Sequence, residues 1–376
     1  MSRSHRKYLL LVVAVAVLVF LLYKFRNSIT LEGFHWSDVV ASVRHANLSL
    51  LLLAIVGIFL CYAVRALRWV RFSRTLGPSR WLTVYTATLM GFSCVFLLGR
   101  AGEPVRPVLI ARRERLSMPG MFGVFFLERI FDVAATVVLA GFALVLFEKH
   151  GGGSARSGHL IAVARSTGVA LFLGLIAVVA FLVYFRFHGG EWLSRRLQHP
   201  TWRTGWRARL AALLEGFSDG LQAVKTWADL GILVGYSVVH WLLVIMVYLL
   251  VERGFGGELA AISFGGTVLV LAFTLVGSAV QLPGVGGGAQ VATFLVLTVA
   301  FGVSAGPAAS MAITVWLISF ASCCIVGVPM LFKEGLSLGE LRRITSAEER
   351  EGEAELLAEA ERASDQDQHD QEASRR

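Results

Sequence analysis

The sequence predicts an all-α, polytopic integral membrane protein with about six spanning helices and two re-entrant helical hairpins in an inverted repeat. Three observations predict this fold class: few charged residues, long apolar blocks, and an internal similarity between two interrupted blocks. Of the 376 residues, 56% are apolar and only 16% are charged, whereas soluble proteins carry about 25% charged residues. The composition therefore argues against a water-soluble globule.

Several apolar blocks are long enough to cross a bilayer, which takes about 20 residues for a hydrocarbon layer of about 30 Å. They are residues 8–23, 48–64, 122–147, 160–184, 230–251 and 308–332. The first block follows a basic cluster, as in a signal peptide, but Lys24, Phe25 and Arg26 stand where small cleavage-site residues are expected. We therefore expect residues 1–47 to form a retained anchor helix and an external loop.

Basic residues predict the orientation of these blocks, because Lys and Arg in short loops tend to stay on the cytoplasmic side. Residues 65–80 contain five arginines and no acid, so we expect a cytoplasmic loop there. Residues 186–229 contain seven basic and four acidic residues and are assigned to the same side, with an amphipathic helix in the headgroup layer. The two termini are then cytoplasmic, and residues 252–258 are external.

Two segments rich in glycine interrupt apolar blocks. Gly99-Arg-Ala-Gly-Glu-Pro-Val-Arg106 follows residues 81–98, and Pro283-Gly-Val-Gly-Gly-Gly288 separates residues 262–282 from residues 289–301. Irregular backbone within the bilayer needs protein or water around it, since lipid cannot satisfy free N–H and C=O groups. We interpret each break as the tip of a re-entrant hairpin that lines a cavity. The alternative is a pair of kinked, full-length spans.

An offset of 185 residues relates the two breaks and their neighbours. It pairs Ser93, Val95, Leu97, Gly99 and Gly102 with Ser278, Val280, Leu282, Gly284 and Gly287. It also carries residues 48–64 onto 233–249 and residues 122–147 onto 307–332. The expected directions of the matched helices are opposite, and such inverted repeats indicate an alternating-access site between two halves.

The repeat also suggests how the chain is divided. We expect a first half at residues 48–229, a second half at residues 230–346, and a disordered tail at residues 347–376. The tail carries eleven acidic and four basic residues. The rest of the chain carries 31 basic and 15 acidic residues, an excess that the positive-inside bias explains without a nucleic acid partner.

Charged residues within the block 122–147 predict a buried polar cluster. Ionised groups there cost at least about 2.5 kcal/mol each, so they should face the protein interior and find partners. Arg129 and Asp132, three residues apart, can pair, and the arginines of the first break are the expected partners of the remaining acid. The predicted cluster comprises Arg100, Glu103, Arg106, Glu128, Arg129 and Asp132.

Two interpretations of this cluster stay open. Arginine forks match phosphate oxygens, so the cluster predicts a port for an anionic lipid headgroup. Helix N-termini after each glycine-rich break would add positive potential. The predicted substrate contacts at the second break are Gly284, Gly286, Gly287 and Gln290. The alternative is a salt-bridge network that only joins two elements.

The remaining motifs indicate neither a cofactor nor a metal. The second break lacks the Lys-Ser/Thr pair of a P-loop and the spacing of a dinucleotide fingerprint, so transport would be passive or ion-coupled. Cys61, Cys94, Cys323 and Cys324 lie in apolar blocks without metal-ligand spacing. We expect no disulfide framework, no bound metal and no cofactor.

The two breaks, together with Leu127-Glu-Arg-Ile-Phe-Asp132, resemble the lysylphosphatidylglycerol synthase transmembrane region family, also called flippase-like domain proteins. The resemblance covers roughly residues 9–332 and implies a bacterial inner-membrane protein that moves polar lipids between leaflets. Only about forty residues follow the last apolar block, so lipid aminoacylation is not expected. Gln290 stands where many members have Glu, and residues 314–317 lack a common Arg, which weakens the expectation of a second charged cluster.

The leading hypothesis is therefore a translocase for lipids with an anionic or glycosylated headgroup, which is not an enzyme. A membrane-embedded transferase on lipid-linked substrates is one alternative, with Glu103, Glu128 or Asp132 as the base. A scaffold whose acidic tail docks a partner is another, and removal of the chain after Ser346 should inactivate only the scaffold. A homo-oligomer is left open.

Overall fold

The computed structural model describes residues 36–149, 226–278, 281–282 and 286–334, together with the single residues 173 and 218. The earlier helices are α2 (Trp36–His45), α3 (Leu48–Phe72), α4 (Trp81–Leu98), α5 (Val105–Glu114) and α6 (Met118–Lys149). The later ones are α10 (Trp227–Phe255), α11 (Gly257–Ala260), α12 (Phe264–Gly277), α13 (Gly288–Leu295), α14 (Ala305–Trp316) and α15 (Ser322–Lys333). The predicted anchor, the block 160–184, the amphipathic segment and the acidic tail lie outside the described residues.

Shorter elements join these helices. The first break forms the 3-10 turn η2 (Gly99–Gly102), and η1 (Ser73–Thr75) follows α3. The strand β1 (Gln281–Leu282) immediately precedes the second break and pairs antiparallel with β2 (Gly286–Gly287) within it. Two π-helical turns, η5 (Val296–Ala300) and η6 (Leu317–Ala321), continue α13 and connect α14 with α15. Apart from the two short strands, the described fold is helical, as the composition predicts.

Four helical segments in the described part of the chain are long and apolar enough to cross a membrane. They are Leu48–Thr75, Trp81–Gly102, Trp227–Phe255 and Ala305–Lys333. On α3, Leu48, Leu52, Val56 and Leu60 recur every fourth residue and are each more than half exposed, which is the pattern of a helix face in contact with lipid. The chain is a multi-pass membrane protein.

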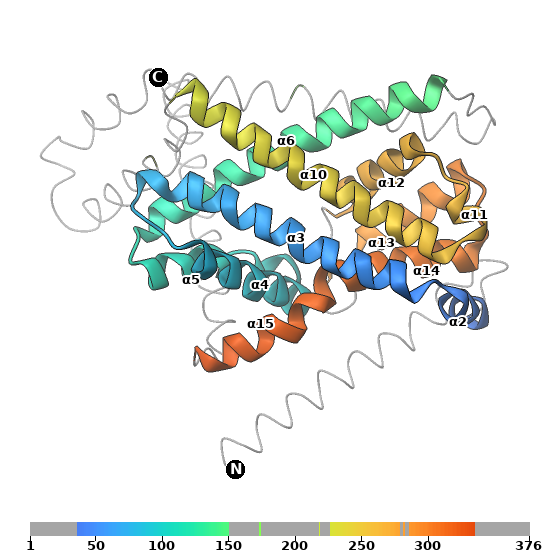
Figure 1. The fold of residues 1–376 in the computed structure, drawn as a ribbon, viewed down its shortest axis with the longest axis horizontal. Coiled ribbons are helices and arrows are strands. Elements are labelled where there is room, and N and C mark those ends of the chain that lie inside the picture. Colours follow the sequence, from blue (N-terminus) through green and yellow to red (C-terminus); the bar gives the residue numbers. More distant parts are fainter. Residues whose placement is uncertain are drawn as a thin grey trace, which may run out of the picture.

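The helices α3 and α10 lie side by side and run antiparallel (Figure 1). Near the start of α3, the Asn47 N–H donates to the Gly254 carbonyl at 2.7 Å. At the other end, Arg71 pairs with Asp229. Between them, Gly57 allows close approach, since a Cβ there would lie 2.9 Å from the Val247 side chain. The 185-residue offset relates these two helices, so the related helices have opposite directions.

Each break reverses the chain, so that the helix after it packs back along the helix before it. In the first hairpin, Gly91 of α4 faces Arg106 of α5. In the second, the Thr274 hydroxyl of α12 lies 2.6 Å from the Thr293 hydroxyl of α13. The tips of the two hairpins meet, because η2 contacts β1.

Long helices of one part pack against the hairpin of the other. α6 packs against α12, and α15 packs against α4 (Figure 1). The 185-residue offset carries α4 onto α12 and α6 onto the α14–α15 segment, so these two contacts are equivalent. In this arrangement, each long helix packs on the hairpin of the other part. The helices α3 and α10, which the offset also relates, contact each other.

Three predicted boundaries are wrong. Residues 65–72 were expected in a cytoplasmic loop but form the last two turns of α3, because acids on α6 compensate Arg65 and Arg68, and Asp229 on α10 compensates Arg71. The predicted apolar block 230–251 ends too early, because α10 continues through Glu252 to Phe255. α12 ends at Gly277, five residues before the end of the predicted apolar block at residue 282, because Gln281 and Leu282 pair with Gly287 and Gly286.

Candidate functional site

Two acids on one face of α6 form the centre of a buried polar cluster. Glu128 and Asp132 are four residues apart, so they share a face of the helix. Glu128 is completely buried, and the Asp132 side chain is 16% exposed. Two like charges at this spacing repel each other, so they need cations between them. Those cations come from α3, from α5 and from α6 itself.

α3 supplies two arginines three residues apart, which places both on the face toward α6. Arg65 Nε donates to Glu128 at 2.7 Å and its Nη2 pairs with Asp132. Arg68 Nη2 donates to Asp132 at 2.7 Å and lies 3.2 Å from Glu128. Each arginine thus bridges both acids. A fully buried cation such as Arg68, with no exposed side-chain surface, is tolerated only with such partners.

α5 supplies Arg106, which is held on two sides. Its Nη2 pairs with Glu128, and its guanidinium lies over the Trp69 ring, 4.2 Å from the ring centroid. The hairpin permits this position, because Gly91 on α4 leaves room for the Arg106 side chain. Glu128 therefore lies where α3, α5 and α6 meet.

A more exposed part of the cluster extends toward the hairpin tips. Arg129 lies 3.1 Å from Glu128, 3.2 Å from Asp132 and 3.6 Å from Glu103. Arg100 lies 3.3 Å from Glu103 and also donates to the Ser278 carbonyl at the end of α12. The Arg129 and Arg100 side chains are 35% and 45% exposed. Both can exchange partners more easily than the buried arginines.

The cluster carries more positive than negative charge. Four arginines contact the two α6 acids, which leaves a formal excess of two positive charges, and the Arg100–Glu103 pair does not change it. Within the described part of the chain, Nε of Arg68 and Nε of Arg129 are buried without a hydrogen-bond partner. Buried donors without acceptors are unfavourable, so the arrangement favours an additional anion.

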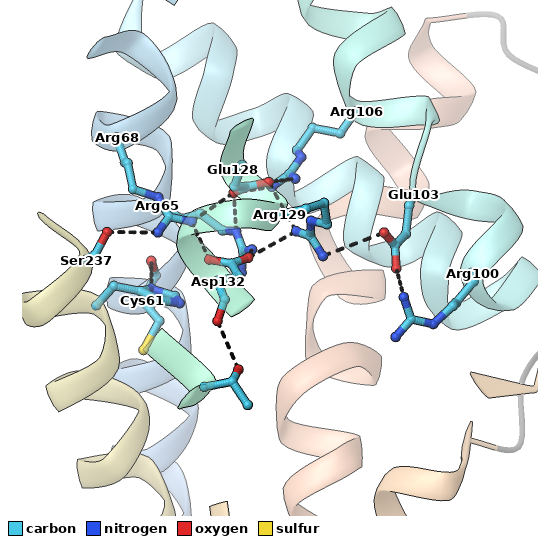
Figure 2. A network of polar contacts seen from close by, with 12 residues as sticks. Cys61, Arg65, Arg68, Arg100, Glu103, Arg106, Glu128, Arg129, Asp132 and Ser237 are labelled. Carbon is cyan, nitrogen blue, oxygen red and sulfur yellow. Dashed lines mark hydrogen bonds and ion pairs between the residues drawn. The ribbon is translucent and has the colours of Figure 1, made fainter. Parts of the chain in front are cut away.

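The contacts form a continuous chain between α10 and α12. Ser237 on α10 accepts from Arg68 at 3.1 Å. From there the contacts pass through the α6 acids, Arg129 and Glu103 to Arg100 (Figure 2). This series of contacts thus begins and ends at residues of the second half of the sequence, and its central residues belong to the first half.

The structure brings most of the predicted cluster together. Arg106, Glu128, Arg129, Asp132 and Glu103 contact one another directly, whereas Arg100 joins only through Glu103. Sequence reasoning missed Arg65, Arg68 and Ser237. The signal for the arginines was their spacing of three next to an apolar block, together with one acid more than bases in the block 122–147.

The second break is placed apart from the acids. Gly286 and Gly287 form β2, and the Gln290 side chain in the first turn of α13 accepts from the Gly287 N–H at 2.6 Å. Gln290 therefore caps the N-terminus of α13, since Gly287 directly precedes this helix. On the approach to this break, the Ser278 carbonyl at the end of α12 accepts from Arg100 of the cluster, and β1 contacts η2. Gly284 lies outside the described residues.

Comparison with known proteins gives one family. The family model described as lysylphosphatidylglycerol synthase TM region matches residues 9–327. No curated protein and no solved structure matches the chain.

Proposed function

Because the chain belongs to the lysylphosphatidylglycerol synthase TM region family, we propose that it is a translocase that moves an anionic lipid headgroup between leaflets. Family membership indicates a membrane protein involved in lipid handling. The finer proposal rests on one observation: the buried cluster at the junction of α3, α5 and α6 carries two more positive than negative charges. A phosphate would supply the missing anion. In this proposal the chain moves lipid without modifying it.

The more exposed edge of the cluster suggests how the headgroup enters. Arg129 and Arg100 share Glu103 as a partner, at 3.6 Å and 3.3 Å. These pairs are longer and more exposed than those around Glu128, so the carboxylate is the easiest partner to displace. We propose that a headgroup phosphate takes the place of Glu103 between the two guanidinium groups. Arg65, Arg68 and Arg106 then act at a distance, because their charge favours the anion.

The arrangement of the helices supports an alternating-access mechanism. The offset-related helices α3 and α10 are antiparallel, and α6 and α15 each pack on the hairpin of the other half. In the proposal these are inverted halves, the hairpins are re-entrant, and their tips meet where the headgroup binds. The acyl chains stay in the bilayer. The membrane is the bacterial inner membrane, with both termini in the cytoplasm.

The proposal is tested with fluorescent phospholipids in liposomes that contain the purified chain. Dithionite bleaches label in the outer leaflet, and a translocase exposes the inner-leaflet label as well. We expect the wild type to increase the bleached fraction for anionic lipids relative to empty vesicles. No difference across a range of anionic and glycosylated lipids would refute the proposal.

A matched pair of variants tests the site itself. Arg129→Leu removes a cluster arginine, whereas Arg74→Leu removes an exposed arginine of η1. We expect Arg129→Leu to lower the rate at least several-fold and Arg74→Leu to leave it unchanged, at equal amounts of reconstituted protein. Equal rates for the two variants would contradict the assignment of the cluster.

A further inference from the structure

A second buried acid, Glu252, lies outside the arginine cluster. It is three residues from the end of α10 and has no exposed surface. Its Oε2 accepts from the Thr267 hydroxyl of α12 at 2.5 Å. Its Oε1 has no hydrogen-bond partner among the residues that the structure describes. Glu252 thus differs from Glu128, which is surrounded by arginines.

The charged and titratable groups around Glu252 do not neutralise it. Arg253 is exposed and donates instead to the carbonyls of Ala260 and Ile262. Tyr248 lies one turn earlier on α10. Among the elements packed against α10, α11 contributes Glu258, and α2 contributes Arg44 and His45. The arginines of α3 and the charged cluster of α6 lie toward the other end of α10, and α12 and α14 carry no titratable residue.

The neighbouring acid Glu258 shows the contrast. It is exposed and accepts from the Ser304 hydroxyl at 2.6 Å and from the Ser304 N–H at 2.7 Å. These hydrogen bonds lower the pKa of Glu258. Glu252 has one hydroxyl donor and no exposed surface. An isolated carboxylate in such surroundings is strongly disfavoured relative to the neutral acid.

We propose that Glu252 is a proton-binding site that couples a proton gradient to lipid movement. The inference rests on the proposed function, because it names the ion that drives the same cycle. The site binds one proton on Oε1 while α10 and α12 are in contact, and releases it to water when they separate. A metal ion fits less well, because Ca²⁺ takes six to eight oxygens and the described residues offer Glu252 only the Thr267 hydroxyl.

Two helices connect Glu252 with the arginine cluster. Along α10, Ser237 contacts Arg68 and lies about 22 Å from Glu252 at a rise of 1.5 Å per residue. Along α12, the chain runs from Thr267 to Ser278, whose carbonyl accepts from Arg100. A shift of α12 relative to α10 would change both the environment of Glu252 and the position of Arg100. Proton release and headgroup release would thus be linked.

The first test measures the protonation of Glu252 and does not depend on lipid transport. Dicyclohexylcarbodiimide converts protonated carboxyl groups in apolar surroundings to stable N-acylureas, which mass spectrometry locates. At neutral pH we expect an adduct at Glu252 of the full chain and none in E252Q. The peptide with Glu128 and Asp132 should stay unlabelled, because both acids pair with arginines. Absence of label at Glu252 from mildly acidic to mildly alkaline pH would overturn the proposal, whether or not the chain moves lipid.

The second test measures whether a proton gradient drives lipid movement. In liposomes with an imposed pH gradient, the wild-type rate of lipid movement should respond to the gradient. E252Q should still move lipid but lose this response, and the exposed control E258Q should keep it. A wild type that moves lipid without responding, or an E252Q that responds like the wild type, would overturn the coupling. A wild type that moves no lipid would refute the proposed function instead and leave the labelling result to decide on Glu252.

Discussion

At the scale of single residues, the cluster shows what local spacing can and cannot reveal. The pairing of Arg129 with Asp132 follows from their separation of three on a helix, and the structure places them 3.2 Å apart. Arg65 and Arg68 could not be assigned in the same way. A run of arginines after an apolar block fits a cytoplasmic loop equally well, and only the distant acids on α6 make burial favourable. Glu252 was missed for the same reason, as it follows an apolar block.

Removal of Glu128 should destabilise the fold strongly. Glu128→Gln leaves the buried Arg106 without a charged partner and leaves Arg65 and Arg68 with Asp132 alone. Breaking a buried ion pair in this way costs about 3–5 kcal/mol. Glu334→Gln is the control, because its pair with Arg113 is partly exposed and should contribute about 0–1 kcal/mol. Thermal unfolding of the two variants in detergent measures the difference. Equal midpoints would show that the cluster does not hold α3, α5 and α6 together.

At the scale of elements, the length of the apolar blocks predicts which segments are helical but not where the helices end. The block 308–332 nearly coincides with the α14–α15 segment, Ala305–Lys333, because Gly302 and Ser304 precede the helix and the charged Lys333 and Glu334 end it. α3 and α10 extend beyond their predicted blocks, since the charges that seemed to end them are accommodated within the fold. The hairpins depend on contacts between helices, which sequence patterns do not show.

The packing of α4 against α5 provides a test at this scale. A Cβ at Gly91 would lie 2.8 Å from Cβ of Arg106, so Gly91→Ala should displace α5 and cost about 1–3 kcal/mol through overpacking. On α10, a Cβ at Gly235 meets nothing within 4 Å, so Gly235→Ala should be neutral or stabilising by up to about 1 kcal/mol. Thermal unfolding and lipid movement should both fall for Gly91→Ala alone. A loss in both variants would indicate general sensitivity of the helices instead.

At the scale of the whole molecule, the 185-residue offset can be detected in the sequence because whole apolar blocks recur at this offset, as well as identical residues. It relates α3 to α10, α4 to α12, and α6 to the α14–α15 segment. The sequence could not show that α6 packs on α12 and α15 on α4, because such an exchange depends on how the halves meet. This exchange connects every movement of one hairpin to the long helix of the other half.

The antiparallel contact of α3 and α10 can be tested by a disulfide. A Cβ at Gly254 would lie 3.6 Å from Cβ of Leu50, which is within the range of about 3.5–4.5 Å for disulfides. In a chain without its native cysteines, Leu50→Cys with Gly254→Cys should cross-link on mild oxidation, as mass spectrometry would detect. Leu50→Cys with Gly235→Cys should not, because Gly235 lies about 28 Å farther along α10. The reverse outcome would exclude the antiparallel arrangement.

The lipids retained by the purified chain test the central claim most directly, namely that the positive cluster binds an anionic headgroup within the membrane. Native mass spectrometry should detect anionic phospholipid bound to the wild type and to Arg74→Leu, and much less of it bound to Arg129→Leu. The same anionic lipid at the same occupancy in all three proteins, or neutral lipid alone in the wild type, would contradict the claim.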